Sequence, residues 1–362
     1  MSEENNVLGS LVNEALEKTR EYSKEDLNIG KANIKVVGCG GGGGNATDWL
    51  YKKGIEGAEI IAINTDKQHL DLIEADKKIL IGRELTRGLG CGGYPNKGRD
   101  AAKEQLTEIK NMIKGSDMVF ITAGLGGGTG TGSAPIVAQV AKENNAIVIG
   151  TVTMPFEIEK ARIDKAEFGL QQLREICDTV IVIDNNRLVK IAGNLPIQQA
   201  FAVANELIST MIKSIVEIIA VPSLVNLDYA DVRAIMANGD VSVIGVGESD
   251  SEHRVDEAVK RALSNPLLDV SYDGATGALI HITGGNDLTL EEVSKAGELI
   301  TEALDADANV IWGSRINPDF KGKLRVMTIV TGVSSPYILG KSSKKDKIIH
   351  HKFKDDLGID MI

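Results

Sequence analysis

The stretch MVFITAGLGGGTGTGSAPIVAQVAKENN (118–145) contains the pattern that decides the fold of this chain. Its apolar, β-branched start at 118–122 predicts a buried strand, and its end at 133–144 predicts a helix. Between them lies GGGTGTG (126–132), a glycine-rich turn whose backbone N–H groups can bind phosphate at the helix N-terminus. Taken alone, such a turn is also compatible with glycines that only allow tight strand–helix packing.

A second glycine-rich turn, GCGGGGGN (38–45), lies between an apolar run at 33–37 and a helical pattern at 45–53. It contains the GxGxxG pattern of dinucleotide-binding proteins as Gly38, Gly40 and Gly43. Two such turns in one parallel sheet would direct two helix N-termini toward one polyanion, whereas a nicotinamide-cofactor domain normally needs one. The chain lacks GxxxxGK[ST], so backbone amides and threonine hydroxyls would bind phosphate, with a metal ion supplying positive charge.

Strand and helix patterns alternate outward from these turns, which predicts an α/β fold. The apolar runs are continuous rather than alternating, so we expect a Rossmann-like parallel sheet that is covered on both faces. The expected strands are 33–37, 60–63, 118–122, 146–152 and 179–183, and the expected helices are 45–53, 99–113, 133–144 and 162–176.

The segment from Pro196 to Val221 carries apolar residues at every third or fourth position for about seven turns. We predict a long central helix that is apolar on more than one side and therefore lies between two domains. Beyond it, helices at 229–237, 252–263 and 290–304 and strands at 241–246, 278–283, 308–313 and 324–331 predict a second, smaller α/β domain. The expected organisation is an N-terminal helical extension (1–29), a phosphate-binding domain (30–195), the central helix (196–221), a C-terminal domain (222–337) and a flexible tail (338–362).

Composition and charge exclude several classes of protein. Forty basic and fifty-one acidic residues give a net charge of −11, which argues against a nucleic-acid-binding surface. The three cysteines form no CxxC pair and the five histidines are scattered, so we expect neither a zinc site nor a disulfide framework. No apolar run reaches the roughly 18 residues that span a bilayer, and the N-terminal MSEENN lacks the features of a signal peptide. We therefore expect a cytoplasmic protein with no direct membrane insertion.

Further short motifs accompany the two glycine-rich turns. In chain order the full set is GCGGGGGNA (38–46), NTD (64–66), GLGCGGYP (88–95), GGGTGTGSAP (126–135), NLDYADVRAIM (226–236) and DGATGALIHITG (273–284). GGGTGTGSAP is similar to the signature of the tubulin superfamily, and the motifs together resemble the FtsZ family, the prokaryotic cell-division GTPases of that superfamily. The resemblance covers about residues 30–335, so it implies a GTP-binding domain at 30–195 and a GTPase-activating domain at 222–337.

The resemblance also implies which residues bind the nucleotide. The glycine-rich turns would hold the phosphates, residues 90–93 would sense the γ-phosphate, and Glu159 and Arg162, which stand one residue closer together than in the family, would lie near the ribose. Asn185 and Phe201 would contact and stack on guanine. Glu206, where the family usually has aspartate, would pair with the guanine N1–H and N2–H₂ groups. The implied phosphate and sensor residues are Gly41, Gly42, Gly43, Gly44, Asn45, Gly90, Cys91, Gly92, Gly93, Gly127, Gly128, Thr129, Gly130 and Thr131.

The acidic loop NLDYAD (226–231) allows two interpretations. By itself, Asp228 can cap the helix that follows, and Asp231 can complement the dipole of that helix. The resemblance instead implies that Asp228, Asp231 and Asn226 are catalytic residues that reach the nucleotide of an adjacent subunit and orient the attacking water. Hydrolysis would then depend on head-to-tail assembly, which propagates as a filament.

The resemblance implies a GTP-hydrolysing cytoskeletal protein of the division ring at mid-cell. Its cofactors would be GTP or GDP with Mg²⁺, the metal being held mainly by the phosphates and water. The chain end LGIDMI (357–362) would bind a membrane-tethering or other division protein. Two alternatives remain, namely an NAD(P)-dependent Rossmann oxidoreductase that uses Gly38–Gly43 with Asp66 as the ribose acid, and a GTP-binding scaffold with little hydrolysis.

Overall fold

The computed structural model describes residues 32–221, 223–236, 242–264, 271–333 and 338–339. The expected N-terminal extension at 1–29 and the expected tail beyond residue 339 lie outside these residues. Within the described part of the chain, we find no helix that is both long enough and apolar enough to cross a membrane.

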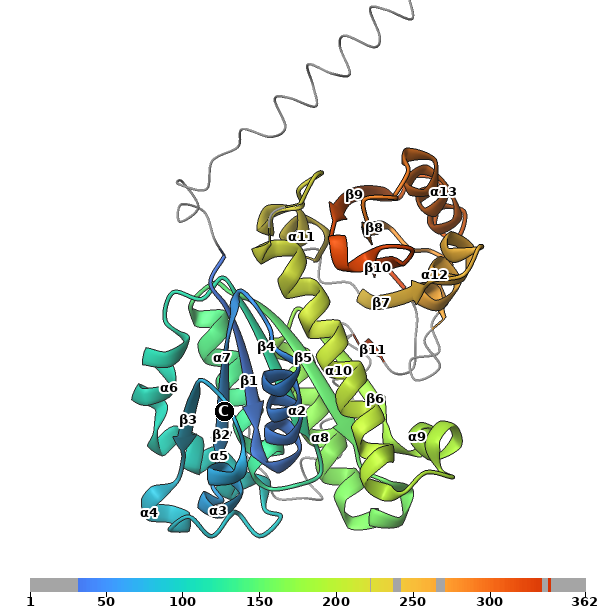
Figure 1. The fold of residues 1–362 in the computed structure, drawn as a ribbon. Helices are drawn as coiled ribbons and strands as arrows, with labels where there is room; N and C mark the ends of the chain where they lie inside the picture. Colours follow the sequence, from blue (N-terminus) through green and yellow to red (C-terminus); the bar gives the residue numbers. More distant parts are fainter. Residues whose placement is uncertain (1–31, 222, 237–241, 265–270, 334–337, 340–362) are drawn as a thin grey trace, which may run out of the picture. The chain divides into compact units, whose positions relative to one another are not determined.

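The first sheet has seven strands in the order β11-β6-β5-β4-β1-β2-β3 (Figure 1). Six of them pair in parallel, and β11 pairs with β6 in the antiparallel direction. The parallel α/β sheet predicted from the continuous apolar runs is thereby confirmed. The strands are β1 (Ile34–Cys39), β2 (Ala58–Asn64), β3 (Lys77–Leu80), β4 (Met118–Gly124), β5 (Ile147–Met154), β6 (Thr179–Asp184) and β11 (Ile338–Leu339).

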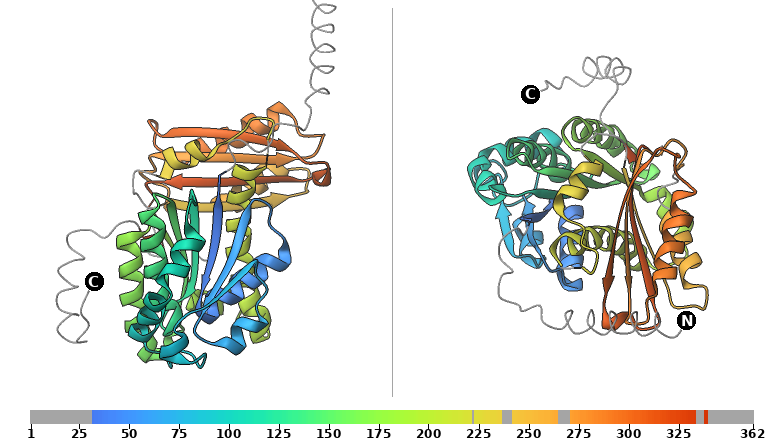
Figure 2. Two further views of the ribbon diagram at one scale, coloured as in Figure 1. Left: turned by 90° about the vertical axis from the view of Figure 1, so that its left-hand side faces the viewer. Right: turned by 90° about the horizontal axis from the view of Figure 1, so that it is seen from above.

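Helices cover both faces of this sheet, as the two views of Figure 2 show. Successive strand residues alternate between the faces, so Val36 and Val37 belong to separate apolar clusters. On the Val36 face lie α2 (Gly40–Lys53) and α10 (Ile197–Ala220), and on the Val37 face lie α5 (Pro95–Glu104), α6 (Leu106–Ile113), α7 (Thr129–Glu143) and α8 (Ile163–Ile176). Shorter helical segments are α3 (Lys67–Leu72), α4 (Arg83–Thr86), η1 (Glu157–Arg162) and α9 (Asn185–Ala192).

The structure differs from the sequence-based expectations at several places, and the short helices α3, α4 and α9 were not expected either. The helices begin inside the two glycine-rich stretches, α2 at Gly40 and α7 at Thr129, so only residues 126–128 of the second stretch form a turn before its helix. The helix expected at 99–113 is divided at Gln105, whose ψ of 24° departs from helical geometry. The short strand β3 was not expected, because KKIL has only two apolar residues. The first two residues of the expected tail, Ile338 and Leu339, form β11 and pair with β6.

The central helix α10 packs against both sheets. Ile208, Ile212 and Ile215 are buried in one apolar cluster that extends from the first sheet to the second, which explains why this helix is apolar on more than one side. The second sheet has the order β7-β10-β8-β9, with strands β7 (Ser242–Ser249), β8 (Gly277–Gly284), β9 (Asn309–Ile316) and β10 (Leu324–Thr331). Its accompanying helical segments are α11 (Tyr229–Met236), α12 (Arg254–Leu263), α13 (Leu290–Thr301) and η2 (Pro318–Phe320).

His281 of β8 is buried between the second sheet and α10. Burial, and secondarily the positive charges of Arg315 and Arg325, lower the pKa of His281 from 6.5 to about 4. In the unfolded chain this imidazole takes up a proton near pH 6.5, whereas the folded protein resists protonation until about pH 4. The contribution of His281 to stability is therefore fully present above pH 6.5 and is lost as the pH falls toward 4.

We expect His281→Asn to reduce the acid sensitivity of the fold. Between pH 6.5 and pH 5, the wild-type protein should lose about 2 kcal/mol of unfolding free energy through this group alone, because one pKa unit corresponds to about 1.4 kcal/mol. Thermal denaturation of both proteins across this pH range measures the difference. Parallel losses in wild type and variant would show that the burial of His281 has no energetic consequence.

Candidate functional site

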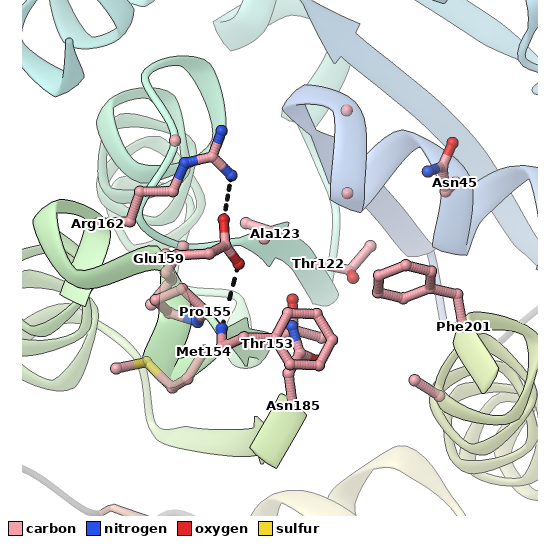
Figure 3. A pocket seen from close by; sticks show the side chains of 18 of the residues that line it. Asn45, Thr122, Ala123, Thr153, Met154, Pro155, Glu159, Arg162, Asn185 and Phe201 are labelled. Atoms are coloured by element: carbon pink, nitrogen blue, oxygen red, sulfur yellow. Dashed lines mark hydrogen bonds and ion pairs between the residues drawn. The ribbon is translucent and has the colours of Figure 1, made fainter. Parts of the chain in front are cut away.

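A cavity of about 450 Å³ lies at the carboxyl ends of the parallel strands. Residues at the ends of β4 and β5 form its floor, and the helices that follow β1 and β4 border it (Figure 3). Strands β1 and β4 are neighbours in the sheet, yet the helices that follow them, α2 and α7, lie on opposite faces of it. The cavity is therefore at the point where the strand order reverses, which is where open α/β sheets bind their ligands.

The two glycine-rich stretches come into direct contact beside this cavity. Gly40 has a φ of +71°, and a Cβ atom on it would lie 2.6 Å from the backbone nitrogen of Gly130. A Cβ on Gly42 would lie 3.0 Å from the Cα of Gly124. Side chains at these positions would push the helices apart. Glycine therefore brings the N-termini of α2 and α7, with their free N–H groups and positive dipole ends, to one place.

Eleven of the predicted site residues line the cavity. They come from α2, the α7 N-terminus, η1, the start of α9 and α10. They are Gly41, Gly42, Asn45, Gly127, Gly128, Thr129, Gly130, Glu159, Arg162, Asn185 and Phe201.

Three predicted glycine-loop residues are structural supports instead of lining residues. A Cβ atom on Gly43 would lie 2.2 Å from the carbonyl oxygen of Thr122, so this glycine allows α2 to pack on β4. Gly44 is buried on the α3 side of the same helix. The hydroxyl of Thr131 accepts a hydrogen bond from the backbone N–H of Gly126 at 3.0 Å.

The loop at 90–93 packs behind the signature glycines and does not line the cavity. The buried thiol of Cys91 donates to the hydroxyl of Thr65, which in turn lies 2.6 Å from that of Thr129. Gly90 donates its N–H to the carbonyl of Thr65, and a Cβ atom on Gly128 would lie 2.6 Å from the Cβ of Cys91. Gly92 and Gly93 both have positive φ, which lets this loop turn tightly.

The end of the cavity formed by α10 contains an aromatic pair. The rings of Phe156 and Phe201 have centroids 5.9 Å apart and an interplanar angle of 69°, an edge-to-face arrangement. Phe201 is 40% exposed, so its ring is accessible for stacking. Asn185 is 9% exposed at the first position of α9 and faces the same space (Figure 3).

Glu206, which the resemblance places at the base, does not line the cavity. Its carboxylate accepts hydrogen bonds from Trp49 Nε1 at 2.8 Å and from Lys53 Nζ at 2.5 Å, so it links α10 to α2 outside the cavity. These hydrogen bonds hold the pKa of Glu206 below its ordinary value, against the opposing effect of partial burial. Asn205, one residue earlier and about 100° around the helix, lines the cavity instead.

Glu159 and Arg162 form an ion pair at the cavity rim (Figure 3). Arg162 donates from Nη1 to Glu159 Oε2 at 2.5 Å, and the backbone N–H of Phe156 donates to Oε1 at 3.1 Å. Their close spacing in the sequence matches this contact across one turn of the 3₁₀ segment η1.

The predicted catalytic residues lie at the other end of the first sheet. The hydroxyl of Tyr229, in α11, donates to the carbonyl of Asp117, which immediately precedes β4. The cavity is at the far end of that strand, about 20 Å away at the usual rise per residue. Asp228 and Asp231 cap each other's backbone N–H groups at 2.9 Å, and the Asn226 side chain accepts from the N–H of Ser223. Asp228 therefore caps α11 and Asp231 lies in its first turn, where a negative charge complements the helix dipole, as the sequence alone suggested. One chain does not bring the two acids to its own cavity.

The sequence-based reasoning missed several lining residues, among them Thr122, Thr153, Pro155 and Asn205. Thr122 is the last residue of the predicted strand 118–122, and Thr153 directly follows the predicted strand 146–152. The rule that ligands bind at the carboxyl ends of parallel strands could have found them. Asn205 carried no comparable signal, because only the rotation of α10 distinguishes it from Glu206.

Two family models match the chain. One describes the Tubulin/FtsZ family GTPase domain and matches residues 33–193, and the other describes the FtsZ family C-terminal domain and matches residues 240–334. This chain belongs to the tubulin/FtsZ family. Membership makes this FtsZ-family protein a GTPase of the tubulin superfamily and replaces the oxidoreductase alternative.

Known relatives resemble this FtsZ-family protein over most of their length. Cell division protein FtsZ 2 of Methanocaldococcus jannaschii is 58% identical, over 95% of this chain and 91% of its own. Cell division protein FtsZ 2 of Halobacterium salinarum is 54% identical, over 88% of this chain and 81% of its own. An empty FtsZ dimer from M. jannaschii superimposes with a TM-score of 0.77 at 50% identity, covering 88% of this chain and 92% of its own. A CetZ2 structure from Haloferax volcanii, 20% identical with a TM-score of 0.71, shares the fold over 90% of this chain and all of its own.

Proposed function

We propose that the cavity binds GTP and that a second copy of this chain, added head to tail, completes the active site. The observation that supports this proposal is the placement of the cavity and the acidic pair at opposite ends of β4. Asp228 and Asp231 of one subunit can approach the cavity of another only if the two stack in the same direction. Such a heterologous contact repeats with every added subunit and builds a filament.

Each part of the cavity then has a chemical role. The N–H groups at the starts of α2 and α7 bind the phosphates, and Phe201 stacks on the guanine ring. The carboxylates of the incoming subunit orient the attacking water. In the described part of the chain, no group of three metal-ligating side chains is found, so Mg²⁺ would be held mainly by the phosphates and water while it neutralises the γ-phosphate.

The cellular role that we propose is cell division, because the similar curated proteins carry that name. We expect the filament to act at the mid-cell division site. The C-terminal stretch LGIDMI (357–362), which lies outside the described residues, would bind a membrane-tethering or other division protein.

Sedimentation and phosphate release test the proposal directly. With GTP and Mg²⁺, the protein should sediment as polymer and release phosphate, whereas with GDP it should stay in the supernatant. Turnover per subunit should rise steeply above a threshold protein concentration. Constant turnover down to high dilution would mean that each subunit has a complete site of its own, and assembly without phosphate release would favour the scaffold alternative.

Asn205→Ala should weaken GDP binding about five- to tenfold, because the side chain loses its hydrogen bonds to the base. Isothermal titration with GDP measures this without assembly or hydrolysis. Glu206→Gln is the matched control on the neighbouring position. Its amide oxygen can still accept from Trp49, and GDP affinity should stay within about twofold of wild type. A larger loss of GDP affinity in Glu206→Gln than in Asn205→Ala would instead indicate that Glu206 binds the guanine base.

A further inference from the structure

His69, the third residue of α3, lies directly behind the cavity residue Asn45. Its imidazole Nε2 is 3.1 Å from Oδ1 of Asn45, and its Nδ1 is 3.3 Å from Nδ2 of Asn64. The backbone N–H of His69 donates to Oδ1 of Asp66, the residue that caps α3, which fixes the position of the ring. A chain of three side chains thus runs from the end of β2 through α3 to the first turns of α2.

The amide of Asn64 decides which nitrogen of the His69 ring carries the hydrogen. Its oxygen accepts from the backbone N–H groups of Thr65 at 2.9 Å and of Asp66 at 3.2 Å. Its nitrogen can only donate, so the facing Nδ1 of His69 must be the acceptor. Rotating the amide of Asn64, which is 4% exposed, would remove both backbone hydrogen bonds. The hydrogen of the ring is therefore on Nε2, which donates to Asn45.

The donation from His69 fixes the orientation of the Asn45 amide. Its oxygen is occupied by Nε2–H, which leaves both hydrogens of Nδ2 for the cavity. In Figure 3 the nitrogen of Asn45 is on the cavity side of the amide. Gly41 and Gly42, one turn earlier on α2, line the cavity beside it. An amide turned the other way would present its oxygen to the same space and would repel an anion.

We propose that His69 is a positioning residue for nucleotide binding, which holds the Asn45 amide with its two donors toward the phosphates. The inference rests on the nucleotide site proposed above. It assigns to His69 a role exerted through Asn45 and not through contact with the ligand, since His69 does not line the cavity. A purely structural role, in which the ring only packs on the backbone of α2, predicts a different set of results.

Two substitutions of equal size at residue 69 separate these roles. His69→Gln supplies an acceptor for Asn64 and a donor for Asn45, so GDP affinity should stay within about twofold of wild type. His69→Glu supplies only acceptors, which turns the Asn45 amide around, and GDP affinity should fall about tenfold, as expected for a lost hydrogen bond to a charged group. Gln68→Glu adds the same charge at an exposed position of α3 and should change the affinity by less than about twofold.

The same pair in an Asn45→Ala background provides the decisive measurement. If His69 acts through Asn45, the difference between His69→Gln and His69→Glu should vanish there, whereas a direct effect of charge or a packing defect would persist. Persistence of the tenfold difference would overturn the proposal, as would an equal loss of affinity in His69→Gln and His69→Glu. Melting temperatures of all variants show whether each one folds.

Nitrogen-15 NMR of the wild-type protein tests the orientation without any nucleotide. Labelled histidine, assigned with His69→Gln, should show hydrogen on Nε2 and a free lone pair on Nδ1. The reverse tautomer would refute the proposed orientation of Asn45. Absence of GDP and GTP binding in the wild-type protein would refute the nucleotide site itself, and the two failures are therefore distinguishable.

Discussion

Asp228→Asn should retain GTP binding and lose about 100-fold or more of its hydrolysis, because a carboxylate that orients or activates water contributes at least that factor. The substitution is suited to this test because the Asp228 Oδ1 accepts the N–H of Asp231, and an asparagine oxygen can accept the same hydrogen bond. The helix cap therefore survives while the charge is removed. Phosphate release with Mg²⁺ at saturating GTP measures the loss, and titration with GDP confirms that the site still fills.

A mixture of two variants distinguishes a shared site from a complete one. Asp228→Asn subunits bind GTP but lack the carboxylate, and Asn205→Ala subunits keep the carboxylate but stay largely empty at low GTP. If acids and cavity come from different subunits, the mixture should turn over faster than the average of the two variants alone. A rate equal to that average would mean that Asp228 acts within its own chain.

Gly43→Ala should destabilise the protein by about 3 kcal/mol and abolish nucleotide binding, the second large effect that we expect. The new Cβ atom would lie 2.2 Å from the Thr122 carbonyl oxygen, and neither the α2 backbone nor β4 can move without disturbing the other. The displaced helix would carry its N-terminus away from that of α7. Thermal denaturation and GDP titration measure the two effects.

Gly127→Ala is the matched control for Gly43→Ala, because Gly127 lines the cavity and does not pack α2 against β4. A Cβ atom there would meet no atom within 4 Å, and its φ is not positive. The melting temperature should therefore remain within experimental scatter of wild type, while any change in GDP affinity reports on the bound ligand. Equal destabilisation by the two substitutions would contradict the distinction between glycines that pack α2 and glycines that line the cavity.

Much of the first sheet follows from local pattern. Continuous apolar runs such as TVIVI at 179–183 are typical of strands that are buried on both faces of a parallel sheet, so the strand positions were predictable. The position of strand β3 was not predictable, because Lys77 and Lys78 are exposed and give no apolar pattern. This segment is a strand because it pairs with β2. The division of the helix at Gln105 also escaped prediction, since nothing in the local composition ends a helix there.

The candidate site shows the same division. The sequence by itself determined that two glycine-rich stretches each follow an apolar strand and precede a helix, and this predicts a phosphate site, because helix N-termini bind anions. Only the structure makes those two strands, β1 and β4, neighbours in the sheet. Tertiary structure alone decided that Asn205 and not Glu206 faces the cavity, because one residue turns a side chain by about 100° around α10. It also decided that Asp228 lies at the end of β4 remote from the cavity. The reason is that the packing of helices and strands sets the distances between residues far apart in the chain, and these distances cannot be predicted from local sequence patterns.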